Sequence, residues 1–159
     1  HREKMLFTRP YLRLPARFVT LKARIFAQSA AKAVNGMHVG VIGATAHEQL
    51  LKAYFPTAIA KPFPDRKTLL EALQKDEVQA VFDDGMALSF WLESEEANNC
   101  CSFTDGPYLA PQFLGQGMTI AVAPKDAALA SAFNNALQSL QQQGKLTELY
   151  LRYFPNSFY

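Results

Sequence analysis

The stretch Met37-His-Val-Gly-Val-Ile42, followed by Gly43-Ala-Thr45 and then by residues 46–54, decides how this 159-residue chain folds. Its opening residues are rich in β-formers and predict a strand, whereas residues 46–54 predict a helix. Thr45 is a residue type that caps helices, so the open N–H groups of the first turn would lie beyond the end of the strand. The stretch therefore predicts a strand–turn–helix unit with hydrogen-bond donors at the carboxyl end of its strand.

Further along the chain, the same order of strand and helix recurs. Pro62 and Pro64 predict a break, and the leucine stripe that follows predicts a helix over residues 66–75. The other expected elements are strands over residues 78–82 and 118–122 and helices over residues 86–92, 126–143 and 145–154. Alternating strands and helices are typical of the α/β class with a parallel sheet.

Composition and charge exclude several classes of protein. With 49% hydrophobic residues, twelve Phe and six Tyr, the chain is too apolar to be intrinsically disordered. Its apolar runs are far shorter than the roughly 20 residues of a membrane-spanning helix. The net charge of +2 does not by itself indicate binding to nucleic acid.

Basic residues are concentrated in residues 1–40, which contain eight Lys or Arg and one acid. Two interpretations are open, an arm that binds nucleic acid and a solvated basic face. The aromatic and aliphatic residues interleaved with these charges favour the basic face, so no nucleic-acid partner is expected.

Two groups of polar residues follow predicted strands. Residues 43–47 follow the first strand, and Asp83 and Asp84 follow the strand over residues 78–82. In open parallel sheets, ligands bind beyond the carboxyl ends of the strands. A helix N-terminus suits an anion and a carboxylate suits a cation, so the two groups together suit a zwitterion. The alternative is that these residues serve only as turns and helix caps.

The sequence lacks the motifs of common enzyme and metal sites. Gly40-Val-Ile-Gly43 does not have the spacing of a dinucleotide fingerprint or of a phosphate loop. The three His residues share no metal-ligand spacing, and there is no Gly-x-Ser-x-Gly turn. No catalytic residue, metal or cofactor is therefore expected.

Cys100 and Cys101 are adjacent, and they are the two cysteines of the sequence. They form either a vicinal disulfide, which an exported protein would allow, or a pair of free thiols in a partly buried strand.

Taken together, several segments resemble the amino-acid-binding proteins of bacterial ABC transporters, that is, bacterial extracellular solute-binding proteins of family 3 with the type II periplasmic binding fold. The segments that carry the resemblance are Phe7-Thr8-x-Pro10-Tyr11, Val39-Gly40-Val41, Ala44-Thr45-Ala46-His47, Val81-Phe82-Asp83-Asp84, Phe113-x-Gly115-x-Gly117-x-x-Ile120-Ala121-Val122 and Tyr153-Phe154-Pro155. They occur in the family's order over nearly the whole chain.

The resemblance implies two lobes that are joined by two hinge strands and close on a ligand. The lobe-one remnant would comprise residues 1–14 and 125–159, the hinge crossings residues 15–29 and 117–124, and lobe two residues 30–116. Most of lobe one precedes the Phe-Thr-x-Pro-Tyr motif in the family, so the chain is expected to be N-terminally incomplete. The lobe-one surfaces left exposed would allow a homodimer.

The resemblance also implies the residues of the binding site. Asp84 matches the acid that holds the ligand's α-ammonium group, and Thr45, Ala46 and His47 match the loop and helix start that receive its carboxylate. Two positions depart from the family. Ala46 stands where a second Thr is usual, and Arg2 lies one residue away from the position of the carboxylate-binding Arg.

The function implied is the capture of an amino acid or a similar small zwitterion for an ABC permease in the inner membrane. The protein would be periplasmic or extracellular, after removal of a signal peptide that this sequence does not contain, and it would not be an enzyme. Two alternatives on the same fold are a ligand-sensing domain of a receptor and, ranked below it, a relative of prephenate-type dehydratases.

Overall fold

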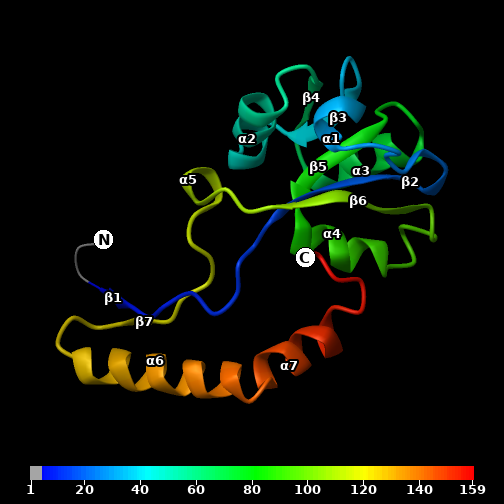
Figure 1. The fold of residues 1–159 in the computed structure, drawn as a ribbon. Helices are drawn as coiled ribbons and strands as arrows, with labels where there is room; N and C mark the ends of the chain where they lie inside the picture. Colours follow the sequence, from blue (N-terminus) through cyan, green and yellow to red (C-terminus); the bar gives the residue numbers. More distant parts are fainter. Residues whose placement is uncertain (1–4) are drawn as a thin grey trace. The chain divides into compact units, whose positions relative to one another are not determined.

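The structure is a computed structural model that describes residues 5–159, and the chain forms two compact units (Figure 1). Unit 1 comprises the described residues up to 13 together with residues 116–155, and unit 2 comprises residues 14–115 and 156–159.

Unit 2 is built on a five-stranded sheet with the strand order β4-β3-β5-β2-β6. The strands are β2 (Ala16–Leu21), β3 (His38–Ile42), β4 (Ile59–Phe63), β5 (Ala80–Asp84) and β6 (Cys101–Tyr108). Strand β3 pairs in parallel with both β4 and β5, whereas β2 runs antiparallel to β5 and β6. The sheet is therefore mixed.

Helices cover both faces of this sheet. They are α1 (Ala30–Ala33), α2 (Ala46–Tyr54), α3 (Arg66–Gln74), α4 (Gly85–Leu92) and α5 (Pro111–Leu114), with a 3-10 turn η2 (Lys22–Arg24). On one face, α1 and α2 pack on Phe18 and Phe82. On the other face, α3 and α4 pack on Val19 and Val81. Neighbouring residues of a strand thus enter opposite cores, as the alternation of side chains along a strand requires.

The predicted parallel pairing is found for β3, β4 and β5, whereas β2 makes the sheet mixed. This strand lies inside the sheet between β5 and β6, and its residues Ala16, Phe18 and Val19 have no exposed surface. It runs antiparallel to β5 with Ala16 opposite Asp84. In sequence order β2 precedes the strand–helix units that begin at β3, so the alternation in those units does not predict its direction.

Strands β4 and β6 were not predicted. Strand β4 contains Pro62, which the sequence analysis took as a break, but β4 lies at the edge of the sheet and pairs there with β3 alone. Proline is tolerated on edge strands because its missing N–H faces away from the ladder. Strand β6, at the other edge, contains Pro107 and begins at Cys101.

Cys100 and Cys101 are joined by a disulfide. Of the two states expected from the sequence, a vicinal disulfide or a pair of free thiols, the structure has the disulfide.

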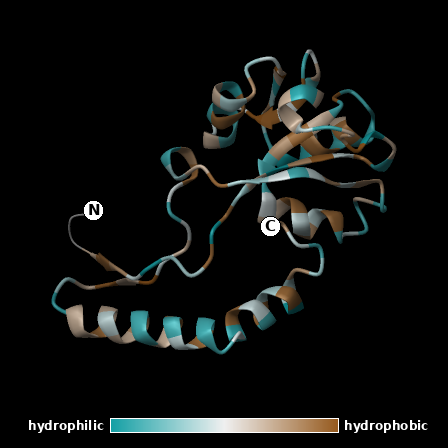
Figure 2. Ribbon diagram, viewed as in Figure 1, coloured by the Kyte–Doolittle hydropathy of each residue, from teal (hydrophilic) through white to brown (hydrophobic). Residues whose placement is uncertain are grey.

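Unit 1 consists of a two-stranded ribbon and two helices. Strand β1 (Leu6–Phe7) pairs antiparallel with β7 (Ala121–Val122), and the helices are α6 (Ala127–Gln142) and α7 (Lys145–Tyr153). Hydrophobic residues recur between polar ones along both helices (Figure 2). Among the described residues of unit 1, Thr8, Val122 and Ala130 are the buried ones, whereas Leu151 and Tyr153 are 60% and 66% exposed.

The units differ in three places from the lobes that the resemblance implies. Residues 16–21 form β2, an internal strand of the unit 2 sheet, and residues 117–124 lie in unit 1. Residues 156–159 belong to unit 2, because Phe158 is completely buried there and the hydroxyl of Ser89 donates to the carbonyl of Asn156. The lobe assignment itself remains a prediction. In the described part of the chain, none of the helices combines the length and apolar character that crossing a membrane requires.

Phe18 is expected to be essential to unit 2, because its ring contacts the rings of Phe55 and Phe82 at centroid distances of 5.1 and 4.6 Å. Phe18→Ala would leave a cavity in the core and should lower the free energy of unfolding by about 3–5 kcal/mol. Urea unfolding followed by the fluorescence of Trp91 measures this change. Phe90→Ala, at a position 56% exposed, is the matched control and should cost about 1 kcal/mol or less. Equal costs for the two variants would contradict the assignment of the core.

Candidate functional site

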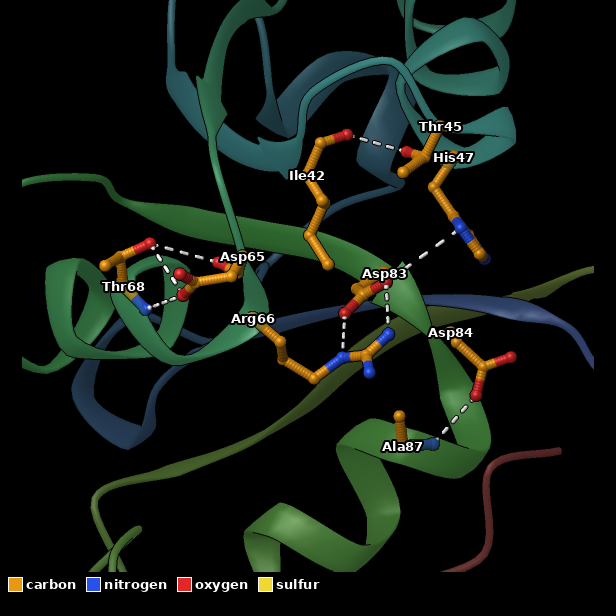
Figure 3. Close-up of polar contacts among 9 residues, drawn as sticks. All are labelled: Ile42, Thr45, His47, Asp65, Arg66, Thr68, Asp83, Asp84 and Ala87. Carbon is orange, nitrogen blue, oxygen red and sulfur yellow. Dashed lines mark hydrogen bonds and ion pairs between the residues drawn. The ribbon is translucent and has the colours of Figure 1, made fainter.

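Three helices begin at one edge of the unit 2 sheet. Helices α2, α3 and α4 follow the carboxyl ends of β3, β4 and β5, and these strands are parallel neighbours in the order β4-β3-β5. The carboxyl ends of parallel strands meet at the same edge, so the three helix N-termini and the residues that precede them come together there (Figure 3). A side chain caps each helix: Thr45 for α2, Asp65 for α3 and Asp84 for α4.

The start of α2 presents free hydrogen-bond donors. The Thr45 hydroxyl donates to the carbonyl of Ile42 at 2.7 Å and accepts from the N–H of Glu48 at 3.3 Å. The Glu48 carboxylate in turn accepts from the N–H of Ala44 at 2.8 Å, which completes a reciprocal cap. Within the described residues, the N–H groups of Ala46 and His47 have no acceptor. Open N–H groups at the positive end of a helix dipole favour an anion such as a carboxylate.

Asp84 ends β5 and caps α4. Its Oδ1 accepts from the N–H of Ala87 at 2.8 Å. The N–H of Gly85 donates to the carbonyl of Pro15 at 2.8 Å, which fixes the backbone directly after Asp84 to the chain entering β2. Oδ2 of Asp84 accepts no hydrogen bond from any residue that the structure describes. The cap therefore leaves one carboxylate oxygen available to a cation.

The side chain of Asp83 is almost completely buried, being 2% exposed, and it is paired with Arg66. Nε of Arg66 donates to Oδ2 of Asp83 at 2.5 Å, and Nη2 donates to Oδ1 at 3.2 Å. A buried carboxylate needs such a partner, because an uncompensated charge in the interior is costly. The paired geometry is the fork that a guanidinium group makes with a carboxylate.

Arg66 was not predicted as a site residue from the sequence. It is the first residue of α3 and follows β4, the strand that was obscured by Pro62. The signal that would have revealed it is its place after a third strand end, equivalent to Thr45 after β3 and Asp84 after β5. Only the pairing of β4 with β3 brings that strand end to the same edge.

His47 lies beside this ion pair, and its side chain points toward Asp83 in Figure 3. Its Nδ1 is 3.9 Å from Oδ1 of Asp83, and the side chain is 18% exposed. Burial lowers the pKa of His47 below 6.5, the positive charge of Arg66 lowers it further, and the carboxylates of Asp83 and Asp84 oppose the shift. The imidazole is therefore neutral at pH 7.

Among Arg66, Asp83, His47 and Asp84, one negative charge is left uncompensated, and the α3 cap Asp65 is a further carboxylate at this edge (Figure 3). Arg66 balances Asp83, His47 is neutral, and Asp84 remains. The structure thus brings together four of the residues predicted from sequence, namely Thr45, Ala46, His47 and Asp84, whereas Arg2 lies outside the described residues. The described part of the chain holds no group of three His, Cys, Asp or Glu that could bind a metal.

The known proteins that are similar to this chain are solute-binding proteins. The sequence profile of the bacterial extracellular solute-binding proteins, family 3, matches residues 1–156. The ABC transporter arginine-binding protein 1 of Escherichia coli is 24% identical over 96% of this chain, and the L-arginine-binding protein of Pseudomonas aeruginosa is 28% identical, also over 96%. The chain spans 60% of the length of each of these relatives.

Solved structures show the same fold. The second substrate-binding domain of GlnP from Lactococcus lactis superposes with a TM-score of 0.80 at 18% identity, over 98% of this chain and 65% of that chain. A Salmonella typhimurium periplasmic binding protein with high arginine specificity gives a TM-score of 0.60 at 22% identity, over 96% of this chain and 66% of that chain. The α/β fold is thus the fold of these binding proteins over about two thirds of their chains.

Removal of the α2 cap should destabilise unit 2. Thr45→Ala leaves the N–H of Glu48 and the carbonyl of Ile42 without their hydroxyl partner. The expected loss is about 1 kcal/mol of unfolding free energy, the usual cost of removing an N-cap hydroxyl. Thr45→Ser keeps the hydroxyl and should retain most of the stability. Urea unfolding of both variants tests the cap, and an equal loss in both would contradict it.

His47 should make unit 2 less stable in mild acid. Its pKa is lower in the folded chain than the unperturbed value of 6.5, so below that pH the unfolded chain takes up the proton first. The unfolding free energy should therefore fall as the pH drops below about 6.5, by at most about 1.4 kcal/mol per pH unit. His47→Gln lacks this contribution, and its stability should fall less steeply between about pH 7 and about pH 5. Parallel profiles for variant and wild type in urea unfolding would refute the assignment.

Proposed function

Because the chain belongs to family 3 of the bacterial extracellular solute-binding proteins, we propose that it is the binding component of an ABC transporter for an amino acid or a similar small zwitterion. Members of this family bind solutes and are not enzymes, in agreement with the prediction that this chain catalyses no reaction. The chain spans 60% of the length of the two relatives named above.

One observation carries this proposal. The open N–H groups of Ala46 and His47 and the free oxygen of Asp84 lie at the same edge of one sheet. An amino acid offers the complementary pair, a carboxylate for the helix start and an ammonium group for the acid. The backbone N–H of Ala46 serves as well as that of a Thr, although the second hydroxyl usual in the family is missing.

A cationic amino acid is the proposed ligand. The site residues of unit 2 carry one uncompensated negative charge, which favours a ligand of net positive charge. Three relatives are named as arginine-binding proteins, which supports the same choice. Arginine is therefore the first amino acid to be tested.

The remaining partners and the location follow from this function. The two units are proposed to correspond to the lobes of the type II periplasmic binding fold, with hinge strands joining them. The protein would deliver its ligand to a permease in the inner membrane and would act in the periplasm or outside the cell. One relative is named as a periplasmic protein. The homodimer through exposed surfaces of unit 1 stays a prediction.

Asp84→Asn tests the proposed site. An Asn oxygen can still cap α4 through Ala87, so the variant removes the charge and keeps the cap. The Kd for the bound amino acid should rise roughly 10- to 100-fold, because a hydrogen bond to a charged group contributes about 1.5–3 kcal/mol. Isothermal titration calorimetry on the full-length protein measures the change.

Asp76→Asn is the matched control for this experiment. Asp76 pairs with Arg24 at 2.6 Å on an exposed part of unit 2 and does not contact the site residues. Its removal should leave the Kd within about twofold of the wild-type value. If Asp84→Asn also leaves the Kd within that range, Asp84 does not hold the ligand.

A further inference from the structure

Two adjacent carboxylates, Asp83 and Asp84, end the strand at the proposed binding edge, but the structure treats them differently. Both oxygens of Asp83 accept from Arg66, at 2.5 and 3.2 Å, and the side chain is 2% exposed. Asp84 makes one backbone hydrogen bond and keeps one oxygen free. The two carboxylates therefore differ: Asp84 has an oxygen that can accept a hydrogen bond from a ligand, whereas both oxygens of Asp83 already accept from Arg66.

The positions of these acids on the sheet explain the difference. Neighbouring residues of a strand point to opposite faces, and Asp83 shares its face with Val81, which lies under α3. Arg66 is the first residue of α3, so its side chain reaches Asp83 directly. The side chain of Arg66 is 42% exposed, so the ion pair joins a buried carboxylate to the surface of this edge.

We propose that Arg66 sets the net charge of the binding edge and thereby the ligand selectivity of the protein. Arg66 donates to both oxygens of Asp83, so Asp83 is not available to the cationic group of a ligand. Asp84 is then the carboxylate that contacts this group. Without Arg66 the group formed by Asp83, Asp84 and Arg66 would carry two negative charges, and without Asp83 it would carry none. The inference rests on the proposed function for its ligand, but the charge balance can be measured without one.

A charge cycle separates this role from a purely structural one. Arg66→Met makes the edge more negative and should favour arginine over glutamine roughly tenfold more than the wild type does. Asp83→Asn makes the edge more positive and should shift the same ratio of Kd values roughly tenfold the other way. The double variant with Arg66→Met and Asp83→Asn has no charge at either position. Its ratio of Kd values for glutamine and arginine should return to within about threefold of the wild-type ratio. A residue with only a structural role would not move the ratio in opposite directions.

The experiment is isothermal titration calorimetry on the full-length protein with L-arginine and L-glutamine, carried out at about pH 8. Arg24→Met is the matched control, because Arg24 makes the same two-pronged contact with Asp76, at 2.6 Å for each bond, away from the site. Its selectivity ratio should equal that of the wild type. Shifts of Arg66→Met and Asp83→Asn in the same direction, or by less than about twofold, would overturn the proposal.

The effect of Arg66 on the charge of this edge can also be measured without a ligand, so it can be tested separately from the proposed function. The charges of Arg66 and Asp83 shift the pKa of His47 in opposite directions, downward and upward respectively. An NMR titration of His47 should therefore show a higher pKa in Arg66→Met and a lower one in Asp83→Asn than in the wild type. If the wild type binds no amino acid, the proposed function is wrong, and this titration decides whether Arg66 sets the charge of the edge. An unchanged His47 pKa in both variants would refute that role.

Discussion

The parallel pairing of β3 with β4 and β5 is the constraint on which the rest of unit 2 depends. Parallel strands cannot be joined by tight turns, so each is followed by a helix that crosses back over the sheet. The start of each crossover helix then lies at the same edge as the other two. The polar residues of the site come together because of this connectivity, although they are far apart in the sequence.

The helix caps at this edge use residues of the proposed ligand site. Thr45 and Asp84 satisfy the first turns of α2 and α4, and each cap leaves part of the helix start or of the carboxylate unoccupied. The site is thus held by hydrogen bonds that stabilise the fold before any ligand is present. Such preorganisation reduces the entropy that binding would otherwise cost. Next to these caps, the ion pair of Arg66 with the buried Asp83 compensates the negative charge of Asp83.

The described residues of unit 1 form a much smaller hydrophobic core than those of unit 2. A two-stranded ribbon with two amphipathic helices buries little apolar surface, and its described residues include exposed side chains such as Phe7, Leu151 and Tyr153. Unit 2 instead has two cores, one on each face of its sheet. Stability measurements that probe Phe18 or Thr45 therefore report on unit 2.

The sequence by itself determined the local features. The helix over residues 46–54, its Thr45 cap, and the positions of Asp83 and Asp84 at a strand end all follow from short-range patterns of propensity and capping. Tertiary structure alone decided the direction of β2, the use of β4 despite Pro62, and the contact of Arg66 with Asp83. These features depend on pairing between distant segments. A proline that ends a strand in isolation is harmless at a sheet edge, and an arginine finds its buried partner only when two strand ends meet.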